Sequence, residues 1–154
     1  MTKEAIPGLG GITNRFGPRN LPEGKAGVVK TEGSLIQIVL HFSGGNYNSG
    51  EIEEPIIPAG FKPLRALVEV ESAAAVGGTD TPTIEIGTNG TEVTNGFSVT
   101  EAQAEAAGVY VITSFNGTWA SQLAAATTIG VALDGTNPTI SGGEFKVTIE
   151  GYLA

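Results

Sequence analysis

The chain has 154 residues, a net charge of −8 and no cysteine, and it contains 23 glycines and 8 prolines. This length suits one domain that buries its own hydrophobic core, and the lack of cysteine excludes disulfides and thiolate metal sites. So many glycines and prolines are typical of short strands joined by tight turns.

Hydropathy argues against a membrane partner. The apolar runs, such as Ile38–Leu40, are far shorter than the roughly 20 residues that a membrane-spanning helix needs. The N-terminal residues also lack the basic and then apolar pattern of a secretory signal. We therefore expect a soluble protein that stays in the compartment where it is made.

Charge is distributed unevenly along the chain. Residues 1–30 contain five basic and two acidic side chains, a net of +3, whereas residues 31–154 contain three basic and 14 acidic ones, a net of −11. Nucleic-acid binding depends on neutralising phosphates, which an acidic domain repels. We therefore expect no nucleic-acid partner.

The first 26 residues show neither a helical nor a strand period, because glycine and proline interrupt every possible element. One interpretation is a disordered tail. The other is an extended arm that becomes ordered on a partner, which the regularly spaced apolar residues favour, since disordered tails contain few of them. We predict an extended N-terminal arm over 1–26. Its candidate partner-binding residues are Ile6, Leu9, Ile12, Arg15, Phe16, Arg19 and Leu21.

Residues 27–154 predict a single β domain. Leu35–Phe42 is apolar on both parities, which indicates a central strand covered on both faces. Farther along, apolar residues alternate with polar ones, and this period of two predicts strands with one buried face. The predicted core comprises Leu64, Ala66, Val68, Val70, Ile84, Ile86, Ile129, Val131, Leu133, Val147 and Ile149. Glu85 is expected to point outward.

One short helix is predicted near 100–107. Thr100 and Gln103 form the pattern of a capping box, alanines follow, and Gly108 ends the helix after about two turns. With about eight strands and turn signals between them, the fold class is all-β: an antiparallel β-sandwich that is jelly-roll-like. The runs GTDTPTI and GTNPTI resemble each other, which we attribute to shared turn chemistry and not to duplication.

The sequence carries no motif for catalysis, cofactor binding or metal binding. It has one histidine, His41, and lacks a G-x-S-x-G motif, a phosphate-binding glycine loop and an H-x-x-H or C-x-x-C pair. Glu51 and Glu53 are interpreted as a solvated or partner-facing edge, and Trp119, the sole tryptophan, as a core or sheet-edge anchor. We predict no catalytic residue, no cofactor and no metal site, and the protein is not expected to be an enzyme.

Five runs carry a family resemblance: IPAGFKPLRALVEVES, PTIEIGTNGTEVTNGFSVTEAQAEAAGVYVIT, GTWASQL, TTIGVALDGTNPTI and FKVTIEGY. They lie within residues 35–152, and the chain there resembles the small jelly-roll proteins encoded beside the major capsid protein of tailed bacteriophages. Those proteins act as head decoration, or cement, proteins. The resemblance implies a non-enzymatic virion protein, made in the host cytoplasm, that binds the major capsid protein on the capsid surface and stabilises the shell. It also implies a homo-oligomer, with a trimer favoured.

Two other functions remain open from the sequence. A carbohydrate- or receptor-binding β-sandwich module of a phage fibre or spike has similar composition, although such modules stack sugars on exposed aromatic side chains. Here Trp119, Tyr47, Tyr110 and Tyr152 are few and scattered. An enzyme of the glycosidase type needs two carboxylates held at a set separation, which a sequence cannot show.

Overall fold

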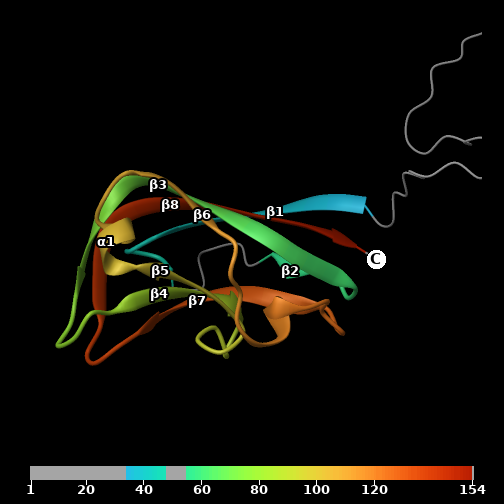
Figure 1. The fold of residues 1–154 in the computed structure, drawn as a ribbon. Helices are drawn as coiled ribbons and strands as arrows, with labels where there is room; N and C mark the ends of the chain where they lie inside the picture. Colours follow the sequence, from blue (N-terminus) through green and yellow to red (C-terminus); the bar gives the residue numbers. More distant parts are fainter. Residues whose placement is uncertain (1–33, 48–54, 154) are drawn as a thin grey trace, which may run out of the picture. The chain divides into compact units, whose positions relative to one another are not determined.

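The computed structural model describes residues 34–47 and 55–153, and Figure 1 shows the arrangement of these residues. They form eight β-strands, one α-helix and one 3₁₀ helix. The elements are β1 (Ser34–Ser43), β2 (Ile56–Ile57), β3 (Phe61–Gly77), β4 (Thr83–Thr88), β5 (Gly96–Thr100), α1 (Glu101–Ala104), β6 (Gly108–Ile112), η1 (Gly117–Ala120), β7 (Thr127–Asp134) and β8 (Thr139–Leu153). Within this part of the chain, no helix has the length and apolar character needed to cross a membrane.

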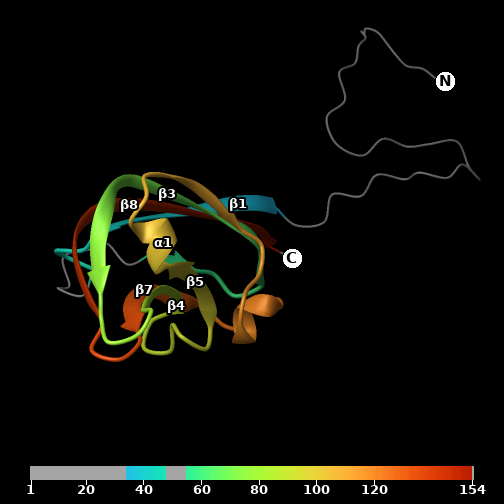
Figure 2. The same cartoon turned by 60° about the vertical axis from the view of Figure 1, so that its left-hand side comes forward.

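The strands form two antiparallel four-stranded sheets, ordered β1-β8-β3-β6 and β2-β7-β4-β5. Figures 1 and 2 show these sheets as two layers. Apart from β4 and β5, which are adjacent in one sheet, each strand is followed along the chain by a strand of the other sheet. This is the strand order of a jelly roll. The predicted all-β sandwich of jelly-roll type is confirmed.

The core lies between the sheets and follows from the alternation along the strands. Phe42 of β1 and Phe145 of β8 stack at 4.8 Å between ring centroids, and their neighbours alternate between core and outer face. Of the predicted core, all but two residues are buried: Ala66, Val68, Val70, Ile84, Ile86, Ile129, Val131, Val147 and Ile149. Leu133 is partly buried and packs against this cluster.

Leu64 is the remaining exception, and its predicted burial is wrong. Its side chain is 41% exposed, although Ala66 is fully buried. The register between β3 and β8 shifts between Pro63 and Arg65, so Leu64 is the additional residue of a bulge. A bulge reverses the parity on one side of it. Residues Phe61 and Pro63 are accordingly buried while Leu64 points away from the core.

The predicted central position of Leu35–Phe42 is also wrong. These residues lie in β1, which is at the edge of its sheet and pairs on one side with β8. Only one parity is buried: Ile38, Leu40 and Phe42 face the core, whereas Leu35 is 73% exposed and Val39 is 43% exposed. The apolar residues of the second parity therefore lie on an outer surface of the domain.

The helix begins where predicted and ends earlier. Thr100 caps it, and both hydrogen bonds of the capping box with Gln103 are present. The helix covers only Glu101–Ala104, one turn in place of the predicted two. Gly108 already pairs with Val70 at the start of β6, so three residues are left to connect the helix to the sheet. Strand pairing overrides the helix propensity of the alanines that follow.

Candidate functional site

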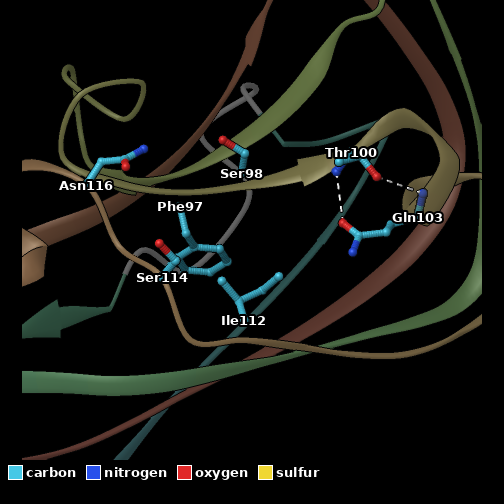
Figure 3. Close-up of a pocket in the computed structure, with 7 residues that line it drawn as sticks. All are labelled: Phe97, Ser98, Thr100, Gln103, Ile112, Ser114 and Asn116. Atoms are coloured by element: carbon cyan, nitrogen blue, oxygen red, sulfur yellow. Dashed lines mark hydrogen bonds between the residues drawn. The ribbon is translucent and has the colours of Figure 1, made fainter.

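A hollow of about 350 Å³ lies beside the N-terminus of α1, and Figure 3 shows its lining. The side chains come from the end of β5, from α1 and from β6 with the segment after it. They are Phe97, Ser98, Thr100, Gln103, Ile112, Ser114 and Asn116. Two are occupied by helix capping: the Thr100 amide donates to Gln103 Oε1 at 3.0 Å, and the Gln103 amide donates to Thr100 Oγ1 at 3.2 Å.

The side chains that line this hollow are all uncharged. Its lining contains hydroxyl and amide groups but no carboxylate, imidazole or amine. General acid–base catalysis and nucleophile activation both need such a group within hydrogen-bonding reach. Among the lining residues, Ser98 has such a group in reach, because its hydroxyl donates to the buried Glu85 carboxylate at 2.9 Å.

Two carboxylates are buried in or beside the second sheet. Glu85 alternates with the core residues Ile84 and Ile86 of β4, as predicted. Its side chain is nevertheless only 3% exposed, so the prediction that it points outward into solvent is wrong. It accepts hydrogen bonds from the hydroxyls of Ser98, at 2.9 Å, and Thr83. Glu92, in the β4–β5 connection, is 7% exposed and accepts from the Gly90 amide at 2.7 Å. Both carboxylates are held by neutral donors, as buried polar groups require.

Across the described ranges, no group of three or more His, Cys, Asp and Glu side chains could hold a metal ion. The single histidine, His41, is exposed on β1 and lies opposite Lys146 in the strand register. The sequence-predicted carboxylates Glu51 and Glu53 lie outside the described residues.

Trp119 is a core anchor, as predicted. It is fully buried, and its indole Nε1 donates to Thr88 Oγ1 at 3.0 Å. Its ring packs beside Phe97 and Phe115, with centroid separations of 6.3 and 6.4 Å. A tryptophan without an exposed ring face offers no platform for stacking a sugar.

The tyrosines do not form such a platform either. The Tyr110 hydroxyl donates to the Ala106 carbonyl at 2.9 Å. Tyr152 lies on the outer face of the β1-β8-β3-β6 sheet, away from the core, and is 38% exposed. No aromatic pair or cluster links them among the described residues, where ring contacts involve only phenylalanines and Trp119.

The predicted arm contacts fall outside the described residues, as does the predicted arm itself. These are Ile6, Leu9, Ile12, Arg15, Phe16, Arg19 and Leu21. Their role stays a prediction, and so does the boundary between the arm and the domain.

A surface that the sequence analysis missed is the outer face of the β1-β8-β3-β6 sheet, which we call the β8 face because β8 runs through it. In one row across all four strands, Val39 pairs with Thr148, Thr148 with Leu67, and Leu67 with Val111. Val39 is 43% and Val111 57% exposed, and Val109, two residues from Val111 on β6, is 62% exposed. The signal for this surface in the sequence was that Leu35–Phe42 has apolar residues at both odd and even positions, and only the even-numbered ones are needed for the core.

An ion pair lies beside this row. Arg65 Nε donates to Glu150 Oε1, and the other oxygen of Glu150 accepts from Gln37 Nε2 at 2.6 Å. The hydrogen bond from Arg65, followed by that from Gln37, holds the pKa of the Glu150 carboxyl below its usual value. The three side chains come from β3, β8 and β1, so they tie the outer surfaces of three adjacent strands together.

Comparison with known proteins gives one structural likeness. No family model and no curated protein matches the chain. A solved structure, a chain of the cyanophage Pam1 capsid asymmetric unit, is similar with a TM-score of 0.54 and 18% sequence identity. The alignment covers 97% of this chain and 100% of that chain, so the two are of comparable length, and the likeness is one of fold.

Proposed function

We propose that this protein is a structural component of a tailed-bacteriophage virion, a decoration or cement protein that binds the outside of the capsid and stabilises it. The observation that carries the proposal is the full-length likeness of this jelly roll to a chain of a phage capsid asymmetric unit. Jelly rolls recur in viral capsid proteins. A fold supports many functions, however, so the sites have to agree with the proposal.

The described side chains agree with a non-enzymatic role. The hollow beside α1 is lined by neutral groups, and the buried carboxylates Glu85 and Glu92 are held by hydroxyl and amide donors. In this proposal the protein is made in the host cytoplasm and then joins the major capsid protein as a homo-oligomer, with a trimer favoured. The arm over residues 1–26 supplies part of the attachment.

The proposal is tested with phage heads that lack this protein because its gene has been deleted. The full-length purified chain is added back, and occupancy is measured by gel densitometry and by cryo-electron microscopy. We expect density on the outer surface of the shell, and we expect decorated heads to keep their DNA at temperatures at which bare heads release it. Absence of the protein from purified wild-type virions, or equal heat resistance of bare and decorated heads, would contradict the proposal.

A further inference from the structure

The pair Asn-Gly occurs three times in the described residues, at positions 89–90, 95–96 and 116–117. In such a pair the backbone nitrogen of the glycine can attack the side-chain carbonyl carbon of the asparagine. Glycine favours this attack because it has no Cβ atom beside the nitrogen and tolerates the backbone angles of the ring that forms. Hydrogen bonds that hold either group must open first, so the fold decides which pair reacts.

The Asn95 side chain is held at both of its polar atoms. Its Oδ1 accepts from the amide and the hydroxyl of Thr118, at 2.9 and 3.1 Å, and its Nδ2 donates to the hydroxyls of Thr91 and Thr94, at 3.1 and 3.2 Å. The glycine of this pair, Gly96, is buried in β5. The side-chain carbonyl carbon of Asn95 therefore cannot approach the Gly96 nitrogen without loss of hydrogen bonds.

In the pair at 89–90, the attacking nitrogen is held instead. The Gly90 amide donates to Oε2 of the buried Glu92 at 2.7 Å. Carboxylates accept stronger hydrogen bonds than neutral oxygens do, so this bond restrains the nitrogen within the turn. The fold protects this pair as well, through the glycine nitrogen.

Neither reacting group is held in the pair at 116–117. Asn116 is exposed and lies at the hollow beside α1, where Figure 3 shows its side chain without a hydrogen bond to the other lining residues. It directly precedes η1 but forms no side-chain capping bond, and within the described residues neither its side chain nor the Gly117 amide forms a hydrogen bond. The first amides of a helix have no partner inside the helix, which leaves the Gly117 nitrogen available.

We propose that Asn116 is a modification site at which the folded protein deamidates spontaneously. The Gly117 nitrogen loses its proton and bonds to Cγ of Asn116, and the side-chain amide leaves as ammonia, which closes a succinimide ring. Water then opens this ring. Cleavage between the nitrogen and Cγ yields aspartate, whereas cleavage between the nitrogen and the main-chain carbonyl carbon yields isoaspartate. The inference does not depend on the proposed function.

The fold requires the glycine of this pair and not its asparagine. Gly117 has a φ of 60°, and a Cβ atom there would lie 2.1 Å from the carbonyl oxygen of Thr94. The Asn116 side chain, in contrast, contributes no hydrogen bond within the described residues. Asn116→Ser therefore removes the reactive pair and keeps a residue type that suits the position before a helix.

Isoaspartate at position 116 would disturb the placement of Trp119. The Asn116 amide donates to the Gly96 carbonyl at 2.8 Å, and the Asn116 carbonyl accepts from the Trp119 amide at 3.2 Å. Isoaspartate routes the main chain through the former side chain, which lengthens the main chain between these two hydrogen bonds. We therefore expect the modified protein to melt at a lower temperature than the fresh protein.

The test incubates the full-length protein at mildly alkaline pH and follows the three pairs by mass spectrometry. Cleavage after glutamate, carried out at acidic pH, places each pair in its own peptide, over residues 86–92, 93–101 and 106–144. Deamidation raises the mass of the peptide, and an isoaspartyl methyltransferase labels the isoaspartate product. We expect Asn116 to react about tenfold faster than Asn95 or more, because the hydrogen bonds of Asn95 must open before it can react.

The unfolded chain is the control for intrinsic reactivity. In concentrated denaturant the fold protects no pair, and we expect all three to react at similar rates. A folded protein that reacts no faster at Asn116 than at Asn95, or that stays unmodified at Asn116 while the denatured chain reacts, would overturn the proposal. Asn116→Ser should keep its melting temperature throughout the incubation. A wild type that is converted at Asn116 without any fall in melting temperature would refute the effect on Trp119.

Discussion

The carboxylate of Asp80 accepts two hydrogen bonds from Thr136 and so joins the β3–β4 and β7–β8 connections of the jelly roll. The backbone amide and the hydroxyl of Thr136 each lie 2.9 Å from an oxygen of Asp80, and the Thr79 amide donates back to the Thr136 carbonyl, also at 2.9 Å. Asp80 follows β3 and Thr136 follows β7. The two segments that resemble each other in sequence, GTDTPTI and GTNPTI, therefore contact each other in the fold.

This contact predicts a pH-dependent contribution to stability. The hydrogen bonds from Thr136, with that from its amide the largest, hold the pKa of Asp80 below its usual value. Stabilisation by Asp80 is then complete above the unfolded pKa of about 3.9 and disappears as the pH falls through the lower folded-state pKa. We expect Asp80→Asn to lower the melting temperature at neutral pH, with the difference from wild type vanishing in strong acid.

Thermal melts followed by circular dichroism over this pH range measure the effect. Thr136→Val is the matched control, because it removes the hydroxyl donor and keeps the backbone amide. It should lower the melting temperature less than Asp80→Asn does. A constant difference between Asp80→Asn and wild type down to the most acidic pH would contradict this account.

The hydrogen bond of the buried Trp119 indole predicts that a nearly isosteric substitution of its partner lowers the free energy of unfolding. Thr88→Val is nearly isosteric, yet it removes the acceptor of the Trp119 Nε1 hydrogen bond at 3.0 Å. An unsatisfied buried donor costs about 1–3 kcal/mol of the free energy of unfolding. Chemical denaturation followed by the fluorescence of this sole tryptophan measures it. Thr79→Val, at an exposed threonine that makes no side-chain hydrogen bond within the described residues, should change stability little, and equal effects at the two sites would rule out the hydrogen bond as the cause.

The sequence predicts the strands because apolar and polar residues alternate wherever a strand has one buried and one solvent-exposed face. It predicts the core through Val68, Val70, Ile84 and Ile86 for this reason, and all four are buried. It misplaces Leu64 because a bulge has no signature in an alternating run. A one-residue insertion exchanges the two faces on one side of it, and only the partner strand reveals where the exchange occurs.

The edge position of β1 is not predictable from its own residues. A strand that is apolar on both parities can be a central strand covered twice, or a strand whose outer face is itself an association surface. Leu35 and Val39 lie on the outer face of this edge strand, where they are 73% and 43% exposed. The placement of Lys62, Arg65 and Lys146 on one face of a sheet is also hidden, because Lys146 is far from the other two in sequence and joins that face only through the pairing of β8 with β3.

Gly87 predicts a steric requirement in the second sheet. A Cβ atom at this position of β4 would lie 2.0 Å from the backbone oxygen of Asn95, which accepts the Thr88 amide at 2.8 Å. Backbone atoms cannot yield as a flexible side chain does, so Gly87→Ala should destabilise the fold by about 1–3 kcal/mol or more. Gly45→Ala is the control, since its Cβ would meet only Ser43 Oγ at 3.7 Å. Equal midpoints of denaturation for the two variants would show that the hairpin can relax around an added methyl group.

The last prediction concerns the N-terminal arm. The eight strands of the described residues form two complete sheets after residue 33, and we expect deletion of residues 1–21 to leave a folded domain with nearly the melting temperature of the full chain. The five apolar arm residues can each contribute about 1.5–3 kcal/mol on burial, whereas ordering each backbone residue costs roughly 1–2 kcal/mol. Summed over the whole arm, the cost of ordering the backbone exceeds the contribution of the five side chains, so the arm by itself is not expected to bind tightly.

Attachment should therefore need the arm and the domain together, strengthened when several arms of one oligomer bind at once. We expect the truncated protein to decorate phage heads far more weakly than the full chain. Arg15→Glu with Arg19→Glu should also weaken decoration, most at low salt, because exposed charges are screened by salt. Occupancy on isolated heads, measured against the full chain at equal concentration, checks both variants. Undiminished occupancy of the truncated protein would refute a role for the arm in attachment, and its failure to fold would instead assign the arm to the stability of the domain.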